Sequence, residues 1–402
     1  MLFEHGSIFD GAERLPSDWA LLVDGEHIAA IGPLTGFAGY AGPRTDMSGQ
    51  TLLPGLIDCH AHLTLSGDLD GFGGALTRFT RAGLTLRALE NAQACLRGGV
   101  TTLRDCGGVD HIEIAVRDAC NSGRLLGPTI RVAGRCICMT GGTNAAVARI
   151  ADGPDEIATA VREQVHAGCD CIKLMATGGV LSPGTDVDDA QYTQAELEAG
   201  VAEARRLRKP VASHAIGAAG ILNAARAGVD SIEHGVFLTD ESIREMLARH
   251  VFLVPTLAAI TQIVANLGSG FSAEVVAKAN KVARAARQSV KSYYQAGGRI
   301  AMGADTGTPF NPHGDNAREL QYMVEAGMSP TDALKAATAN AADLLRLGTR
   351  GRLKSGFIAD LLLVDGDPTR DIARAADRGH HRAVFKAGRC VHERADRPQP
   401  HH

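Results

Sequence analysis

The stretch that decides the fold is Leu53-Pro-Gly-Leu-Ile-Asp-Cys-His-Ala-His62, an apolar run that ends in two histidines. Side chains alternate between the two faces of a β-strand, so His60 and His62 would project from the same side of such a strand. Two imidazoles on one face at a strand end can begin a metal site. A pair of solvated strand-end histidines fits the motif equally well. The rest of the chain decides between these two interpretations.

Outward from this run, short apolar segments alternate with longer segments rich in Ala, Glu and Arg. Such alternation indicates a parallel sheet whose strands are joined by crossover helices. Eight strands are expected, at Leu52–His62, Thr101–Asp105, Thr129–Ala133, Cys171–Met175, Pro210–His214, Ser231–His234, Phe252–Thr256 and Arg299–Asp305. Helices are expected at Leu84–Arg97, Asp155–Ala167, Gln194–Leu207, Ala218–Ala227, Asp240–Arg249, Ala273–Ala296 and 331–346. This order predicts an α/β fold with a (β/α)8 TIM barrel. A doubly wound open sheet is the second choice, because no Gly-x-Gly-x-x-Gly follows the first strand.

The two ends of the chain share a different pattern, in which short strands are broken by turns. Asp24-Gly25 lies between two apolar runs, which is a strong hairpin signal. Residues 359–368 and 382–392 repeat the pattern near the other end. Chain termini often lie close together. We therefore predict a small discontinuous β-sandwich domain of residues 1–50 and 352–395, and a barrel domain of residues 51–351.

Composition and charge narrow the class of protein. With 45% hydrophobic and 21% charged residues, the chain is typical of a globular protein rather than a disordered one. A net charge of −4 and the lack of basic runs argue against nucleic acid or an anionic membrane as a partner. The scattered cysteines, the N-terminus without leader character and the lack of a long apolar run predict a cytoplasmic protein. The final His401-His402 is interpreted as the remnant of an expression tag.

Polar residues fall at the expected strand ends, where the active sites of (β/α)8 barrels lie. These residues are His60, His62, Lys173, His214, His234 and Asp305. Any one of them taken alone could be a buried polar group whose hydrogen bonds are satisfied. Six at functional positions of one barrel are difficult to attribute to chance, so we interpret them as one site.

Lys173 lies between Cys-Ile and Leu-Met-Ala, inside an apolar strand. A charged lysine there would carry a large desolvation cost, which favours the neutral amine. A neutral amine can react with carbon dioxide to form a carbamate, an anionic ligand with two oxygens that can bridge two metal ions. The alternative is a lysine paired with an inward carboxylate such as Asp305. Histidines, a carbamate and an aspartate suit Zn²⁺, although the sequence does not exclude manganese, cobalt or iron.

Taken together, the motifs resemble those of the amidohydrolase superfamily, the metal-dependent (β/α)8 hydrolases. The matching segments are Pro54-Gly-Leu-Ile-Asp-Cys-His-Ala-His62, Ile172-Lys-Leu-Met-Ala-Thr-Gly-Gly179, Ser213-His-Ala215, Ile232-Glu-His-Gly235, Met302-Gly-Ala-Asp-Thr-Gly-Thr-Pro309 and Gly356-Phe-Ile-Ala-Asp-Leu-Leu-Leu-Val-Asp365. The resemblance covers essentially the whole chain. It is strongest to the imidazolonepropionase-like or Xaa-Pro dipeptidase-like branch, which includes carboxypeptidase-type dipeptidases and ochratoxin-hydrolysing amidases.

The resemblance implies a binuclear site of two divalent metal ions. The two histidines of the opening stretch would hold the more buried ion, with Asp305 beside it. His214 and His234 would hold the more exposed ion. Lys173, carboxylated by CO2, would bridge both together with a hydroxide. The shared hydroxide would attack the amide carbonyl, and Asp305 would act first as general base and then as general acid.

Three positions bear on the substrate that the resemblance implies. Deaminases of the superfamily have Glu where this chain has Gly217, so deamination is disfavoured and amide hydrolysis is preferred. Relatives commonly have His where this chain has Thr143, and some dipeptidases have Tyr where it has Ile216. The grip on a peptide backbone or carboxylate that those residues provide therefore does not transfer to this chain.

Further substrate contacts are expected in the loops that follow the strands. His313 follows strand eight and is a candidate contact, the alternative being a residue that begins the next helix. The N–H of Gly178 could approach a ligand closely. Leu63 and Val180 could provide an apolar wall. Asp105 is expected to make an internal salt bridge rather than to bind metal.

Asp58 and Glu233 are expected to orient the ligand histidines or the barrel backbone. The leading hypothesis is a binuclear amidohydrolase that cleaves an amide bond of an N-acyl amino acid or dipeptide-like small molecule. Hydrolysis of a cyclic amide, an ester or a carbamate on the same site is the alternative. A non-catalytic scaffold is the third, but it would be expected to have lost ligands, and none is lost. A homo-oligomer is expected, because dimers are the commonest soluble assembly.

Overall fold

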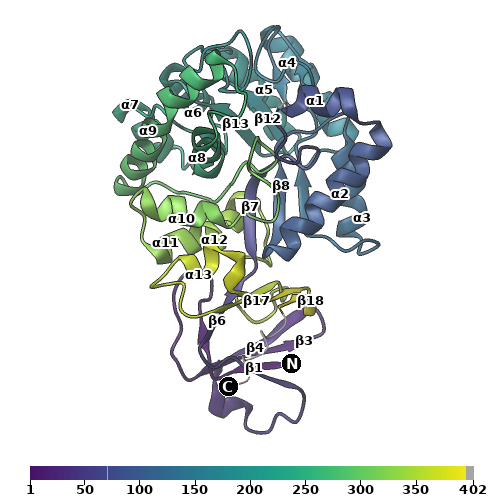
Figure 1. The fold of residues 1–402 in the computed structure, drawn as a ribbon, viewed down its shortest axis with the longest axis vertical. Helices are drawn as coiled ribbons and strands as arrows, with labels where there is room; N and C mark the ends of the chain where they lie inside the picture. The colour runs from purple at the N-terminus through teal and green to yellow at the C-terminus, as the bar shows by residue number, and fades with distance from the viewer. Residues whose placement is uncertain (70, 395–402) are drawn as a thin grey trace.

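The structure is a computed structural model that describes residues 1–69 and 71–394. Its larger part is built of strands and surrounding helices, and its smaller part consists of strands from the two ends of the chain (Figure 1). The end of the predicted β-sandwich segment at residue 395, and the predicted tag remnant His401-His402, lie outside the described residues. Within the described part of the chain, no helix is long and apolar enough to cross a membrane.

The smaller part contains two sheets. The first has the order β4 (His27–Pro33), β3 (Trp19–Asp24), β1 (Leu2–Glu4), β5 (Arg44–Asp46). The second has the order β18 (Arg389–Glu393), β17 (His381–Lys386), β16 (Leu361–Asp365), β6 (Gln50–Pro54), β2 (Ser7–Ile8). The antiparallel pairing of β3 and β4 runs up to Asp24 and His27, which confirms the predicted hairpin at Asp24-Gly25.

One apolar cluster joins the two sheets of the smaller part. Phe3 and Leu21 of the first sheet and Leu52, Leu363 and Phe385 of the second belong to it. The rings of Phe3 and Phe385 meet edge to face with their centroids 5.2 Å apart. Burial of apolar surface is the main favourable term in folding, so strands from both chain ends depend on each other for stability.

The larger part contains parallel strands in two hydrogen-bonded sets. One set is β7 (Leu56–Ala61), β8 (Val100–Asp105) and β9 (Thr129–Val132). The other, in spatial order, is β11 (Arg149–Ile150), β10 (Ile137–Cys138), β12 (Ile172–Met175), β13 (Val211–Ala215), β14 (Ser231–His234) and β15 (Phe252–Val254). The predicted strands two to seven are therefore confirmed to within two residues at each end.

Residues 299–306, predicted as the eighth strand, form isolated bridges rather than a regular strand. Their backbone nevertheless bonds on both sides. The N–H of Leu253 in β15 donates to the carbonyl of Arg299 at 2.9 Å, and the N–H of Asp305 donates to the carbonyl of His60 in β7 at 2.7 Å. An α/β fold with parallel strands is thus confirmed, and it is consistent with the predicted barrel.

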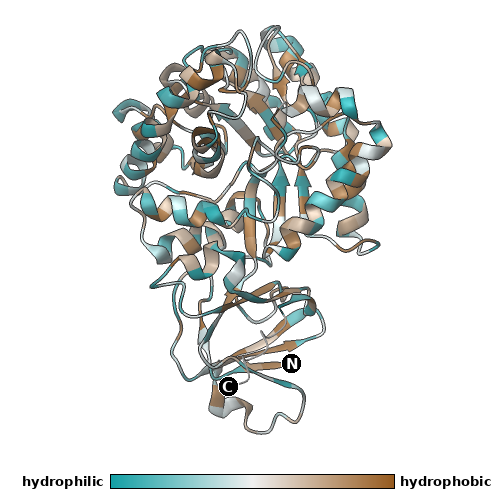
Figure 2. Cartoon of the chain, viewed as in Figure 1, coloured by the Kyte–Doolittle hydropathy of each residue, from teal (hydrophilic) through white to brown (hydrophobic). Residues whose placement is uncertain are grey.

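Helices lie around these strands, with hydrophilic residues on their outer faces and hydrophobic residues concentrated on the strands (Figures 1 and 2). They are α1 (Gly71–Arg78), α2 (Arg81–Arg97), α3 (Ile112–Asn121), α4 (Gly153–Ala167), α5 (Gln194–Arg206), α6 (Ala218–Ala227), α7 (Asp240–Ala248), α8 (Leu257–Ala265), α9 (Ala273–Gln295), α10 (Arg318–Glu325), α11 (Pro330–Ala336), α12 (Ala339–Leu344) and α13 (Ala373–Ala376). The single helix predicted over 331–346 is wrong. Thr338 has φ −132° and ψ −93°, outside the helical region, and it separates α11 from α12.

The prediction of one strand over Leu52–His62 is also wrong. β6 pairs with β16 and β2 in the smaller part, whereas β7 pairs with β8 in the larger part. Gly55 separates the two strands. A Cβ built on Gly55 would lie 2.3 Å from Cγ2 and Oγ1 of Thr101, so only glycine lets the chain pass from one sheet to the other so close to β8.

This close approach gives a test of the crossing point. We expect Gly55→Ala to lower the free energy of unfolding by about 1–3 kcal/mol, because the added methyl group overlaps the Thr101 side chain. Urea denaturation with unchanged metal content would measure the effect. Gly36→Ala, whose Cβ would meet no atom within 4 Å, is the matched control and should change stability by less than about 0.5 kcal/mol. Equal effects of the two substitutions would contradict the role of Gly55.

Candidate functional site

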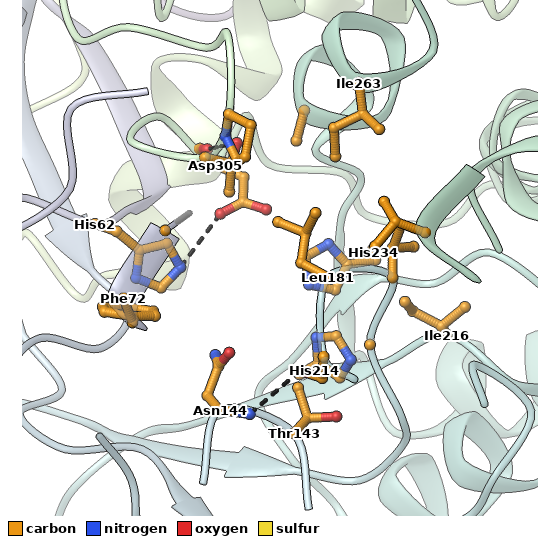
Figure 3. A pocket seen from close by; sticks show the side chains of 18 of the residues that line it. His62, Phe72, Thr143, Asn144, Leu181, His214, Ile216, His234, Ile263 and Asp305 are labelled. Carbon is orange, nitrogen blue, oxygen red and sulfur yellow. Dashed lines mark hydrogen bonds and ion pairs between the residues drawn. The ribbon is translucent and has the colours of Figure 1, made fainter. Parts of the chain in front are cut away.

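The structure brings the six predicted ligands together at the carboxyl ends of the parallel strands. His60 ends β7 and His62 follows it, Lys173 lies in β12, His214 in β13, His234 in β14 and Asp305 in the segment 299–306. All of them line the same cavity. Figure 3 shows His62, His214, His234 and Asp305 around one space. Residues up to 245 positions apart in the sequence, from 60 to 305, are therefore neighbours in the fold.

The side-chain atoms of these residues lie within a few ångströms of one another. Asp305 Oδ1 is 3.2 Å from His62 Nε2 and 3.5 Å from His60 Nε2. Lys173 Nζ is 3.4 Å from His60 Nε2. The ring centroids of His214 and His234 are 4.6 Å apart. His60 and His62 therefore lie beside Asp305, and His214 and His234 lie beside each other.

Each of the four histidines is held by its other ring nitrogen. The partner atoms are Glu233 Oε2 for His60 Nδ1 (2.7 Å), the Gly107 carbonyl for His62 Nδ1 (2.7 Å), the Gly178 carbonyl for His214 Nε2 (3.1 Å) and Thr256 Oγ1 for His234 Nδ1 (2.7 Å). A hydrogen bond of this kind fixes the tautomer and the ring orientation of a metal-binding histidine. The opposite nitrogen of each ring is left as a lone-pair donor for the site.

Two buried carboxylates, Asp58 and Glu233, form hydrogen bonds to His60. Glu233 accepts from His60 Nδ1, and its other oxygen lies 2.8 Å from Arg104 Nη2. Asp58 accepts the N–H groups of His60 (2.9 Å) and Ala304 (3.2 Å). The predicted orienting roles of Asp58 and Glu233 are thereby confirmed. Burial alone would raise the pKa of Glu233, but Arg104 and His60 hold it well below its usual range.

The predicted salt bridge of Asp105 is wrong. Its carboxylate accepts the backbone N–H groups of Leu63 (2.7 Å) and Gly107 (2.9 Å) instead. The internal salt bridge belongs to its neighbour Arg104, which pairs with Glu233. Asp105 therefore shapes the turn that follows β7, next to the carbonyl group that holds His62.

The backbone is strained at the site. His234, Thr256 and Asp305 have φ values of 71°, 52° and 55°, in the left-handed region that residues with a Cβ seldom adopt. Such conformations persist only where the surrounding structure holds them in place, and they cluster at functional sites. Here the strain places the Thr256 hydroxyl 2.7 Å from His234 Nδ1.

The electrostatics favour neutral imidazoles beside an ionised carboxylate. Burial, with Lys173 adding to the effect, lowers the pKa of His60 to about 4 and that of His214 to about 3. Burial opposes ionisation of Asp305, yet the neighbouring histidines hold its pKa well below the usual range. His62 is the exception, because its interaction with Asp305 outweighs burial and raises its pKa. Neutral imidazole and ionised carboxylate are the forms that bind metal ions.

The donor set fits a divalent cation. One ligand atom from each of His60, His234 and Asp305 can be chosen so that all three lie within 4.8 Å of one another. Asp305 Oδ1 is buried and has no hydrogen-bond partner among the described residues. A buried carboxylate oxygen without a donor is costly, and a cation among these nitrogens would satisfy it. Nitrogen and oxygen ligands of this kind suit Zn²⁺ in particular.

A cavity of about 810 Å³ opens in front of these residues. This is within the range of pockets that enclose small organic molecules. Among the predicted substrate contacts, Thr143, Val180 and Ile216 line the cavity. These three residues come from different loops after β10, β12 and β13, so the cavity wall is assembled from separate βα units.

The other three predicted substrate contacts do not line this cavity. Leu63 is fully buried in the main apolar core. The N–H of Gly178 already donates to the Asp189 carbonyl at 3.1 Å, so it is not free for a ligand. His313 Nε2 lies 2.9 Å from the carbonyl of Leu65 and 3.2 Å from that of His62, and burial lowers its pKa to about 4. His313 therefore supports the turn after β7 rather than contacting substrate.

Several cavity residues were not identified from the sequence. Phe72 of α1 meets the His62 ring edge-on, with centroids 5.4 Å apart. Ile263 of α8 and Phe271 before α9 also line the cavity, as does Asn144. Apolar residues on helices and loops have the same pattern whether they face a core or a cavity, so the sequence carried no signal for them. Thr256 could have been found, because it ends the expected seventh strand.

A buried carboxyl group, that of Glu113, lies near Asp105. Glu113 of α3 is completely buried, and neither of its carboxyl oxygens has a hydrogen-bond partner among the described residues. Burial raises its pKa to about 8, and the nearby Asp105 contributes in the same direction. At neutral pH the folded protein therefore keeps Glu113 protonated.

The chain is similar to known proteins in both sequence and structure. A family model described as "Amidohydrolase family" matches residues 51–391. Ochratoxinase of Aspergillus niger is 32% identical over 372 residues, covering 84% of this chain and 75% of the relative. Imidazolonepropionase of Paracoccus denitrificans is 28% identical, covering 88% of this chain and 90% of the relative. A crystal structure of a Xaa-Pro dipeptidase with methionine bound in its active site superposes with a TM-score of 0.86 at 33% identity, covering 98% and 99% of the two chains.

Glu113 makes stability depend on pH. The unfolded chain releases the Glu113 proton above the usual pKa of about 4.5, whereas the folded protein holds it up to about pH 8. The contribution of Glu113 to the free energy of unfolding therefore becomes less favourable as pH rises from about 4.5 to about 8. We expect Glu113→Gln to remove that cost and to raise the free energy of unfolding, relative to wild type, by about 3–4 kcal/mol more at pH 8.5 than at pH 5. Melting curves at the two pH values measure this. A difference between the proteins that does not change with pH would contradict the buried proton.

Proposed function

This chain belongs to the amidohydrolase family and is a hydrolase of carbon–nitrogen bonds, and on that premise we propose that it is a binuclear metal-dependent amide hydrolase. Its substrates belong to the class of small molecules in which an acyl group is joined to an amine, as in N-acyl amino acids and dipeptide-like compounds. The observation that carries the proposal is the convergence of four anchored imidazoles on Asp305 and Lys173.

The proposal includes the complete architecture. Residues 299–306 bond to β15 on one side and to β7 on the other, which supports a ring of eight parallel strands. The two sheets of the smaller part share one apolar cluster, which supports a β-sandwich of residues 1–50 and 352–395 beside a barrel of residues 51–351. In such a barrel the strand ends converge from all sides, as the six site residues require.

The ligands divide into two groups in this proposal. His60, His62 and Asp305 would hold the more buried ion, and His214 and His234 would hold the more exposed one. Lys173, carboxylated by CO2, would serve as a ligand shared by both ions, for which Zn²⁺ is the simplest choice. The burial of Lys173 supports this role, as does the lack of any ion pair between Lys173 and a carboxylate among the described residues.

Two bound cations would acidify a shared water and polarise the scissile carbonyl group. The protein then supplies proton transfer through Asp305, whose carboxylate is held ionised and can take a proton from the attacking water. The same carboxyl group returns the proton to the nitrogen of the leaving amine. His62, 3.2 Å away, keeps the carboxylate in place, and the strained backbone at residue 305 restricts its movement.

The bridging role of Lys173 is tested by metal analysis and mass spectrometry. We expect wild type grown with zinc to contain about two metal ions per chain, and the intact protein to carry the mass of one added CO2. Lys173→Met should contain fewer than about one ion and lose hydrolysis, since the bridge is removed. Lys281→Met alters an exposed lysine of α9 and is the matched control. Fewer than one metal ion per chain in wild type, with an unmodified Lys173, would falsify the binuclear site.

Asp305→Asn tests the proton transfer separately. Asparagine keeps an oxygen ligand but cannot take a proton, so metal content should stay near that of wild type while kcat falls by about 10²–10⁴-fold. Asp315→Asn, in the loop that follows, is the control, because Asp315 pairs with Arg318 and Arg378 rather than with the site. Full activity of Asp305→Asn would contradict the shuttle, whereas loss of metal would show that Asp305 acts mainly as a ligand.

A further inference from the structure

We propose that the substrate of this site is an uncharged amide with apolar groups on both sides of the scissile bond, and that a free carboxylate next to the amide is excluded. This inference rests on the amide hydrolysis of the proposed function, but it moves the substrate away from N-acyl amino acids and dipeptides, because those carry a free carboxylate next to the amide. It follows from the chemistry of the cavity wall outside the six candidate ligands.

The wall of the cavity carries no charge of its own. Of its lining residues, Lys173 and Asp305 are the charged side chains, and both belong to the candidate metal centre. No arginine and no second lysine lines it within the described part of the chain. A carboxylate that leaves water for this cavity would therefore find no partner outside the metal centre. An ionised group buried without a partner is strongly disfavoured.

The lining hydroxyl groups are uncharged, and several of them are hydrogen-bonded to the protein. Thr143 Oγ1 donates to the Thr177 carbonyl at 3.0 Å, and Thr308 Oγ1 donates to the Asp305 carbonyl at 2.7 Å. Ser272 Oγ accepts the N–H of Val275 at the start of α9. The Thr143 hydroxyl thus directs its hydrogen to the Thr177 carbonyl rather than into the cavity. These groups do not replace the missing cation.

Apolar side chains flank the polar centre on two sides. Phe72 lies against His62, whereas Ile216 and Ile263 lie on the side of His214 and His234 (Figure 3). A scissile amide held at the centre would thus place its acyl group against one apolar wall and its amine group against the other. Aromatic or branched aliphatic groups fit such walls, because their burial is favourable.

Asn144 provides one neutral polar contact. Its side chain projects into the space between Phe72 and His214 (Figure 3), and no hydrogen bond from its carboxamide is found among the described residues. A carboxamide can both donate and accept, so it can bond a carbonyl, ether or amide group. It carries no charge to balance a carboxylate. The cavity therefore recognises a neutral substrate by shape, with one hydrogen bond to orient it.

The test compares substrates that differ only in the carboxylate. N-benzoyl-2-phenylethylamine and N-benzoyl-L-phenylalanine have the same acyl group and the same aromatic amine, and the corresponding acetyl and phenylacetyl pairs extend the comparison. With the zinc-loaded full chain, we expect kcat/KM to be about 100-fold or more higher for the neutral member of each pair. The pH is kept where the carboxylate is fully ionised.

A variant then supplies the missing cation. Val180 lines the cavity and is partly exposed, so Val180→Lys can be accommodated at its rim. We expect it to reduce the preference for the neutral substrate by at least about tenfold, whereas Val180→Met, of similar length but uncharged, keeps the preference of wild type. The ratio of the two kcat/KM values is the readout, so a general loss of activity does not affect the conclusion.

The outcomes distinguish a failure of the substrate inference from a failure of the proposed amide hydrolysis. An equal or higher kcat/KM for the carboxylates overturns the neutral-substrate inference and leaves amide hydrolysis intact. No hydrolysis of any member of the three pairs by enzyme that holds its full metal complement overturns the proposed function and the inference with it. Hydrolysis of the neutral members, with a preference that Val180→Lys weakens and Val180→Met does not, supports both.

Discussion

The buried ion pair between Arg104 and Glu233 is the interaction on which the site depends. Arg104 is almost fully buried in β8, yet it bonds the Cys59 carbonyl in β7 and the Glu233 carboxylate in β14. Three parallel strands are thereby tied together beneath the candidate site. Glu233 in turn holds His60 Nδ1 at 2.7 Å. Removing one partner of a buried pair leaves an uncompensated charge, at a cost of about 3–5 kcal/mol, so fold and site are stabilised by the same contacts.

The strained backbone at the candidate site likewise depends on the packing of the fold. His234, Thr256 and Asp305 adopt left-handed conformations that each cost on the order of 1–3 kcal/mol. The surrounding parallel strands and the tight packing at Gly303, where a Cβ would lie 2.4 Å from Val254, hold them in place. The packing of the parallel strands therefore offsets the cost of these conformations at the candidate site.

The pattern of polar residues in apolar strands was sufficient to predict which residues gather at the candidate site, but not the residues around them. His60 and Asp305 were identified at the ends of apolar strands and Lys173 within one, because a polar residue seldom occurs there unless it has a chemical or structural role. His313 and Gly178 follow strands in the same way, but their polar groups are taken by carbonyl groups of the turn after β7 and by Asp189, which only the folded loops reveal. The break of the first strand at Gly55 was missed because both halves are equally apolar. Cavity residues on α1 and α8 had no distinguishing pattern at all.

The protonation states of the buried polar residues depend on the apolar wall of the cavity around them. Burial keeps His60 and His214 neutral to a pH of about 4 and about 3, and so presents lone pairs rather than protons to the cavity. The same burial leaves Asp305 Oδ1 without a hydrogen-bond donor among the described residues. An apolar wall strengthens these electrostatic interactions, because it lowers the effective dielectric constant around them. A charged group in the wall would weaken that effect and compete for the cations, whereas a neutral amide would not. The lack of charge in the wall of the described cavity is therefore compatible with the proposed metal centre, and the proposed preference for an uncharged substrate follows from the same property.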